Sequence, residues 1–174
     1  MYMGNMAKKL TAIILCAAMG LSFSACAGKT EPESTSPQMG IANPMQASTV
    51  EDMMQETGVS VDLSELGFDA TVFRYNFEPV MYQIVLASAD GQQYTLRFQQ
   101  AEEVADISGM YFSWTDTQPS QYGNGQISTT AEGQGICLWW DKGYTFSLSA
   151  DSNATYDSMD SICSAVVASV KVAE

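Results

Sequence analysis

The chain has 174 residues, of which 20 are acidic and 7 basic, and a net charge of −13 at neutral pH. So acidic a protein repels nucleic acid, because phosphate binding depends on clustered Lys and Arg. Histidine is absent, which removes the commonest general base and the usual zinc motifs, so the sequence predicts no catalytic residue, no metal site and no cofactor.

The N-terminal segment is typical of an export signal that ends at a lipidated cysteine. Two lysines precede an uncharged run at 10–23, which is shorter than the about 20 apolar residues of a membrane-spanning helix. Ser24-Ala25-Cys26 then resembles the bacterial lipobox, although Phe23 stands where Leu is usual. We predict a lipoprotein signal peptide over 1–25 and a diacylglycerol on Cys26 that anchors the protein to the extracytoplasmic face of the cell membrane. The alternative is an ordinary signal peptide next to an incidental cysteine.

A flexible, lipid-anchored tether is predicted between this anchor and the folded domain. Residues 26–47 are rich in Pro, Gly, Ser, Thr and Glu and poor in large apolar side chains. A short helix is predicted to begin at Ser48, because Ser48 and Glu51 match the Ser-x-x-Glu capping box, and to end before Gly58. A single folded domain accordingly spans 48–174.

Several segments with β-rich composition or a period of two predict strands. Asp90-Gly91 predicts a hairpin, since both residues tolerate the positive φ of a primed turn. Asp141-Lys142-Gly143 predicts a second hairpin with a three-residue connection. The predicted strands are Phe68–Phe77, Val80–Ala89, Gln92–Gln99, Tyr111–Asp116, Gly125–Ala131, Gly135–Trp140 and Tyr144–Ala150.

The second hairpin is predicted to have one apolar and one polar face. The apolar face, expected to pack on the core, carries Ile136, Leu138, Trp140, Tyr144, Phe146 and Leu148. The opposite face, expected to meet solvent, carries Cys137, Trp139, Thr145, Ser147 and Ser149.

The C-terminal segment has the clearest helical period. From Met159 to Val170, apolar side chains fall at i, i+3, i+4, i+7, i+8 and i+11, and this helix is expected to cross the apolar face of the sheet. We therefore predict an α+β fold, an antiparallel sheet of about five to seven strands with an N-terminal and a C-terminal helix packed on one face.

Cys137 and Cys163 are the two cysteines of the predicted domain. Outside the cytoplasm such a pair can form a disulfide. Cys163 is expected to point from the helix into the core and Cys137 to the other face of its strand, which works against a bridge unless a bulge reverses the alternation. The pairing stays open at this point.

The folded part resembles a group of uncharacterised single-domain lipoproteins of Gram-positive, gut-type bacteria. Related domains of unknown function are similar to the small α+β fold of PsbP-like proteins of the photosystem, so the resemblance implies that fold. It brings no established catalytic residues. It rests on Ile41-Ala42-Asn43-Pro44-Met45, Asp90-Gly91, Tyr94-Thr95-Leu96-Arg97, Asp106-Ile107-Ser108-Gly109, Trp140, Gly143-Tyr144 and the final amphipathic helix.

Trp139 is the main candidate for a ligand or partner surface, because a large aromatic side chain exposed on a polar sheet face often indicates an interaction site. Arg97 is also predicted on a polar strand face, where its guanidinium would stack on the indole ring. Tyr122 and Trp114 are candidate further members of this surface. The alternative is that the loop at 119–125 covers Trp139 and makes it part of the core.

Two acidic segments have more ordinary interpretations than a site. Oxygen-bearing side chains alternate from Asp151 to Asp157 as at the start of a calcium loop, but the Gly and Glu of an EF-hand are missing, so a turn and a helix cap are predicted. Glu102, Glu103 and Asp106 are expected in a solvated loop rather than as catalytic carboxylates.

The sequence therefore favours a membrane-anchored, extracytoplasmic and non-enzymatic binding module. Its expected partners are the membrane, through the lipid on Cys26, and an unidentified protein or small-molecule ligand. The alternative is an extracellular hydrolase that uses carboxylates, which would need two of them converging in a pocket.

Overall fold

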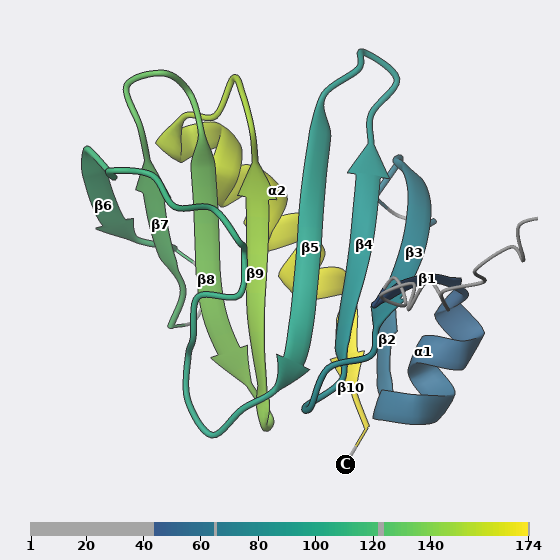
Figure 1. The fold of residues 1–174 in the computed structure, drawn as a ribbon. Helices are drawn as coiled ribbons and strands as arrows, with labels where there is room; N and C mark the ends of the chain where they lie inside the picture. Colours follow the sequence, from purple (N-terminus) through teal and green to yellow (C-terminus); the bar gives the residue numbers. More distant parts are fainter. Residues whose placement is uncertain (1–43, 65, 122–123, 174) are drawn as a thin grey trace, which may run out of the picture. The chain divides into compact units, whose positions relative to one another are not determined.

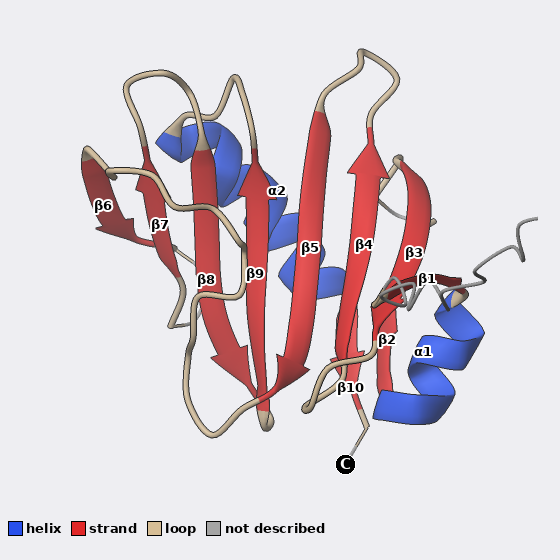
Figure 2. Cartoon of the chain, viewed as in Figure 1, coloured by secondary structure: helices blue, strands red, loops and turns tan. Residues whose placement is uncertain are grey.

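The computed structural model of the chain describes residues 44–64, 66–121 and 124–173. The described residues belong to one compact unit. The described residues form ten strands and two helices (Figures 1 and 2), and neither helix is long and apolar enough to cross a membrane. The predicted signal peptide, Cys26, most of the tether and Tyr122 lie outside the described residues, so those assignments stay predictions.

Eight strands form one antiparallel sheet in the order β1-β3-β4-β5-β9-β8-β7-β6, which exceeds the predicted five to seven strands. A second, two-stranded sheet pairs β2 (Val59–Val61) with β10 (Val170–Val172). An antiparallel sheet together with two helices agrees with the predicted α+β class. The strands of the main sheet are β1 (Met45–Ser48), β3 (Asp69–Tyr75), β4 (Met81–Ala87), β5 (Gln93–Gln100), β6 (Asp116–Pro119), β7 (Gln126–Thr129), β8 (Gly135–Asp141) and β9 (Tyr144–Ala150).

Two strand assignments from the sequence are wrong. The segment predicted as a strand at Tyr111–Asp116 is irregular as far as Thr115, and β6 begins at Asp116. Met45–Ser48, assigned to the tether and the helix start, instead pairs with β3 as an edge strand. The composition of this short segment does not favour a strand. It becomes one because the free edge of β3 offers backbone hydrogen-bond partners, which a reading of the local sequence does not reveal.

Both helices begin at a threonine cap. Helix α1 (Val50–Thr57) is capped by Thr49, one residue later than predicted, whose Oγ1 accepts a hydrogen bond from the N–H of Asp52 at 3.0 Å. Gly58 ends it with a φ of 71°, as predicted. Helix α2 (Tyr156–Ser169) begins with a capping box between Thr155 and Ser158, which confirms the predicted turn and cap in this segment.

The core lies between the main sheet and α2, which crosses behind the strands in Figure 1. A row of aromatic rings runs across four neighbouring strands on this side, and the stacked Tyr82–Phe98 pair has ring centroids 5.8 Å apart. Met53 of α1 belongs to the same buried cluster as the side chains of α2. The row consists of Tyr82, Phe98, Phe146 and Trp139, and the α2 side chains that pack on the sheet are Met159, Ile162, Cys163 and Val166.

The connection between β8 and β9 has two residues rather than the predicted three. Asp141 pairs with Tyr144, and Lys142 and Gly143 have positive φ values of 45° and 85°, as in a type I′ turn. A register change of one residue moves every side chain to the opposite face of the sheet. The predicted faces are therefore wrong for β8, where Cys137 and Trp139 face the core. They are correct for β9, where Tyr144, Phe146 and Leu148 face it.

The same correction applies to the cysteines. Cys137 is paired across the sheet with Leu148 and is completely buried, and Cys163 of α2 is buried on the same side. The expectation that the two side chains face opposite sides of the sheet is wrong. Both are free thiols in this structure.

The outer face of the sheet, opposite α2, is covered where we predicted solvent. The segment 101–115 passes in front of β8 and β9 in Figure 1. Within it, the N–H of Ala105 donates to Oγ1 of Thr145 at 2.9 Å, and that hydroxyl donates to the carbonyl of Ala105 at 3.0 Å. Nε1 of Trp140 donates to the carbonyl of Ala101 at 2.8 Å. Thr145 and Ser147 are consequently buried although they lie on a polar face.

Candidate functional site

Trp139 belongs to the core and is unsuitable as a binding surface in this fold. Its side chain is 4% exposed. The indole ring stacks on Phe146 with centroids 5.0 Å apart and planes within 4° of parallel. The alternative interpretation is therefore confirmed in placing Trp139 in the core, and the loop at 119–125 as its cover stays a prediction.

Arg97 lies on the opposite face from Trp139, because its cross-strand partner is Ser147, which in turn pairs with Leu138. Its Nε donates to Oε1 of Gln83 at 2.8 Å, and its Nη1 donates to the carbonyls of Ile107 and Ser108. The guanidinium is thus used in holding the segment 101–115 on the sheet. The predicted stacking of Arg97 on Trp139 is wrong.

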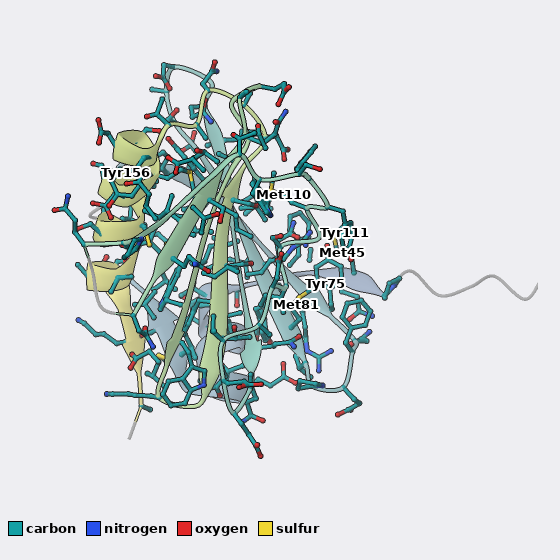
Figure 3. The ribbon with its side chains drawn as sticks, turned by 90° about the vertical axis from the view of Figure 1, so that its left-hand side faces the viewer. Met45, Tyr75, Met81, Met110, Tyr111 and Tyr156 are labelled. Atoms are coloured by element: carbon teal, nitrogen blue, oxygen red, sulfur yellow. The ribbon has the colours of Figure 1, made fainter. Side chains whose placement is uncertain are left out.

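The two further candidates do not complete that surface. Trp114 is half-buried and contacts Phe112 edge-on, with centroids 6.1 Å apart, while Tyr122 lies outside the described residues. Figure 3 shows Met110 and Tyr111 on the side opposite α2, where Tyr75 and Met81 also lie. Tyr111 is 97% exposed.

The acidic run lies in solvent, as expected. Glu102, Glu103 and Asp106 are exposed. Oδ1 of Asp106 accepts hydrogen bonds from the N–H of Ser108 at 2.9 Å and from its hydroxyl at 2.7 Å, which closes a local turn. Within the ranges that the structure describes, no group of His, Cys, Asp and Glu could hold a metal ion.

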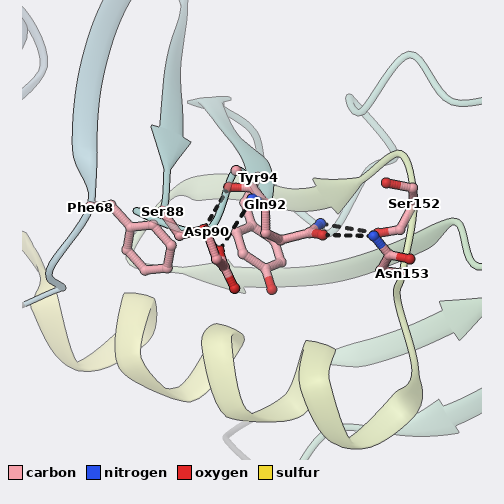
Figure 4. Close-up of a pocket in the computed structure, with 8 residues that line it drawn as sticks. Phe68, Ser88, Asp90, Gln92, Tyr94, Ser152 and Asn153 are labelled. Atoms are coloured by element: carbon pink, nitrogen blue, oxygen red, sulfur yellow. Dashed lines mark hydrogen bonds between the residues drawn. The ribbon is translucent and has the colours of Figure 1, made fainter.

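A concave site lies instead where the β4–β5 connection meets the β9–α2 connection (Figure 4). Its volume is about 490 Å³, within the usual range for small-molecule sites of about 300–1,000 Å³. The wall on one side is aromatic and the rest is polar. We call this the hairpin pocket; its lining residues are Phe68, Ser88, Asp90, Gly91, Gln92, Tyr94, Ser152 and Asn153.

The hairpin turn itself places the carboxylate of this pocket. The predicted hairpin at Asp90-Gly91 is confirmed, but its connection spans 88–92 and only Gly91 has a positive φ, 91°. The N–H of Gly91 donates to the carbonyl of Ser88 at 3.0 Å, which closes the turn. The carboxylate of Asp90 accepts hydrogen bonds from the hydroxyl of Ser88 and, at 3.3 Å, from the N–H of Gln92. These two bonds, the hydroxyl first, lower the pKa of Asp90, so it is ionised at neutral pH.

Gln92 joins the two connections that form the hairpin pocket. Its Nε2 donates to the carbonyl of Ser152 at 3.0 Å, and its Oε1 accepts from Nδ2 of Asn153 at 3.3 Å. Asn153 adopts a positive φ of 57°, which Asn tolerates better than most residues. The two sides of the pocket are therefore held together by side-chain amides across 60 residues of sequence.

The aromatic wall consists of Phe68 and Tyr94. Their rings meet edge to face with centroids 5.8 Å apart and planes at 85°. Burial, followed by the charge of Asp90, raises the pKa of Tyr94, so its phenol stays protonated and can donate a hydrogen bond. The pocket thus combines apolar ring surface with one carboxylate, two amides and two hydroxyl-bearing serines, and its lining has no basic side chain.

The sequence contained a partial signal for the hairpin pocket. Asp90-Gly91 and Tyr94 stood out as turn and strand motifs, and Asn153 as part of a weak calcium pattern. No sequence pattern predicted that the hairpin contacts the β9–α2 connection, because the two segments are far apart in the chain and meet only in the folded sheet.

Comparisons of the chain with models of protein families, with curated proteins and with solved structures found no match.

Proposed function

We propose that the chain is a membrane-anchored, extracytoplasmic binding module that holds a neutral, hydroxyl-rich ligand of the saccharide class in the hairpin pocket. The observation that supports this most is the composition of the lining, in which aromatic rings adjoin a carboxylate and side-chain amides. The apolar face of a sugar ring packs on aromatic carbon, while its hydroxyls donate to carboxylate and amide oxygens.

The charges around the pocket favour a neutral ligand. Asp90 is ionised and no Lys or Arg is among the lining residues, so an anionic ligand would meet repulsion without a counter-charge. A hydroxyl group that donates to Asp90 would form a charge-assisted hydrogen bond, which is about twice as strong as a neutral one. The phenol of Tyr94 would serve as a donor to a ring or hydroxyl oxygen.

The alternative, a carboxylate-dependent hydrolase, has less support. Glycoside hydrolysis usually needs two carboxyl groups about 5–9.5 Å apart across the substrate. Asp90 is the one carboxylate among the residues that line the hairpin pocket. We therefore expect binding without turnover, which an assay for released reducing ends would check.

Binding is best tested by titrating the protein with a panel of neutral mono- and disaccharides and following amide chemical shifts by NMR. The perturbed resonances should cluster at 88–94 and 152–153. Asp90→Asn should weaken binding by roughly tenfold or more, since it removes the charged acceptor. The control is Asp52→Asn, the same change at an exposed site on α1, which should leave affinity unchanged. Equal affinities for the two variants, or shifts spread away from the pocket, would contradict the proposal.

The anchor needs its own test. Cys26 should be found lipid-modified at the N-terminus when the protein is isolated from native membranes and analysed by mass spectrometry. Cys26→Ser should release the protein from the membrane fraction. An unmodified N-terminus would remove the lipid from the proposal and leave the pocket as it is.

A further inference from the structure

The structure brings the two cysteines of the described domain together in the middle of the core. Cys137 of β8 is 0% exposed and Cys163 of α2 is 1% exposed. Helix α2 packs against β8, and Cys137 lies on the side of that strand that faces the helix. Both side chains belong to one buried cluster, and the side chain of Cys163 lies close enough to Cys137 to raise its pKa.

Elements on both sides fix this arrangement. Cys137 lies between the cross-strand partners Leu148 and Ile127, and both are fully or almost fully buried. On α2, Asp160 lies one turn before Cys163 and is tied down, because its Oδ1 accepts from the hydroxyl of Ser120 at 2.9 Å and from the N–H of Gln121 at 3.0 Å. These two hydrogen bonds fix α2 to the segment that follows β6, one helical turn from Cys163.

We propose that Cys137 and Cys163 form an intramolecular disulfide that joins α2 to β8 when the chain folds in the presence of a disulfide oxidant. The reaction is thiol–disulfide exchange with a small or protein disulfide. One cysteine thiolate attacks the oxidant and forms a mixed disulfide, which releases one thiolate of the oxidant. The second cysteine then attacks the mixed disulfide and releases the other. The two cysteines lose two protons and two electrons, and the oxidant is reduced to two thiols.

Burial determines when this reaction takes place. The neighbouring side chain of Cys163, followed by burial and the charge of Asp160, raises the pKa of Cys137. The thiolate, which is the reactive form, is therefore scarce in the folded protein. Oxidation is expected during folding, while the thiols are still exposed. The finished disulfide should then resist reductants as long as the protein stays folded.

The test is refolding of the denatured, reduced full chain in a glutathione redox buffer, followed by proteolysis without reduction and mass spectrometry. We expect a peptide pair that links Cys137 to Cys163, and a melting temperature that falls by roughly 10 °C when the disulfide is reduced in denaturant and the chain is refolded with reductant. Free thiols at both positions, or links from either cysteine to Cys16 or Cys26, would overturn the proposal.

Two variants act as controls. Cys137→Ala and Cys163→Ala should each abolish the linked peptide and make the melting temperature independent of reductant. The linked peptide is sought in the wild-type chain. The proposal can therefore be tested even if neither variant folds. A reductant-dependent melting temperature in both variants would also contradict the proposal, because the effect would then arise elsewhere.

Discussion

Replacing Glu56 with Gln should destabilise the protein by about 1–2 kcal/mol at neutral pH, and the loss should shrink in acid. Glu56 lies on α1 and its carboxylate accepts three hydrogen bonds. Nε and Nη2 of Arg74 on β3 each donate at 2.6 Å, and the hydroxyl of Tyr82 on β4 donates at 2.6 Å. Within the described residues, this cluster is what ties α1 by charge to the main sheet.

The magnitude follows from the pKa and the exposure. Hydrogen bonds from Arg74 and then Tyr82 lower the pKa of Glu56 from 4.5 to about 2. In a fully buried group such a shift would correspond to about 3 kcal/mol. The side chain of Glu56 is 36% exposed, however, so solvent screens the ion pair to about 1 kcal/mol or less. The bond from the largely buried Tyr82 adds about 1 kcal/mol.

The pH dependence has a definite sign. Because folding lowers the pKa of Glu56, the stabilisation is fully present above the unfolded-state pKa near 4.5 and declines as the pH falls toward about 2. Burial, together with the bond to Glu56, raises the pKa of Tyr82 to about 12, so its phenol remains a donor over this range. The difference between wild type and Glu56→Gln should therefore be greatest above pH 5 and smallest near pH 2.

Urea denaturation followed by tryptophan fluorescence at a series of pH values measures this difference. Glu51→Gln is the matched control, because Glu51 is an exposed residue on the same helix. It should change stability by no more than about 0.5 kcal/mol. A loss for Glu56→Gln that is the same at pH 7 and pH 2.5, or no larger than the loss for Glu51→Gln, would refute the reasoning.

Three further substitutions probe the corrected sheet faces. Trp139→Ala should cost about 3–5 kcal/mol in urea denaturation without affecting ligand binding, because the indole is a core ring; a loss below about 1 kcal/mol would contradict its burial. Gly109→Ala should lower the free energy of unfolding more than the control Gly67→Ala in the same assay. Both glycines have positive φ, but only at Gly109 would a new Cβ lie 2.7 Å from Nη1 of Arg97; equal losses of stability would mean that backbone strain alone causes the effect. Ser147→Ala should be neutral or stabilising, because the buried hydroxyl of Ser147 has no hydrogen-bond partner among the described residues, and a loss above about 1 kcal/mol would point to a partner.

Local sequence signals predicted the elements that depend on neighbouring residues. The period of the last helix is seen in the buried side of α2, from Met159 to Val166. Strand β9 has the predicted bounds Tyr144–Ala150, and the hairpin at Asp90-Gly91 lies where expected. Each of these follows from side-chain spacing or from a turn residue, which act over only a few positions.

The candidate site was less predictable for a physical reason. The surface proposed around Trp139 depended on the assumed length of one turn, and a difference of one residue reversed the two faces of β8 relative to β9. Arg97 was correctly placed on the polar side of its strand, but the segment 101–115 covers that side. A covering segment without regular structure leaves no periodic pattern in the sequence.

The sequence by itself determined the acidic charge, the lack of histidine, the amphipathic spacing of α2 and the positions of the hairpins. These properties belong to single residues or to short runs, so no distant contact is needed to establish them. Only the tertiary structure decided which face of β8 packs on the core, that the thiols of Cys137 and Cys163 meet there, and that Gln92 reaches Asn153 to form the hairpin pocket. These depend on strand register and on contacts between distant segments, which are set by the packing of the whole sheet.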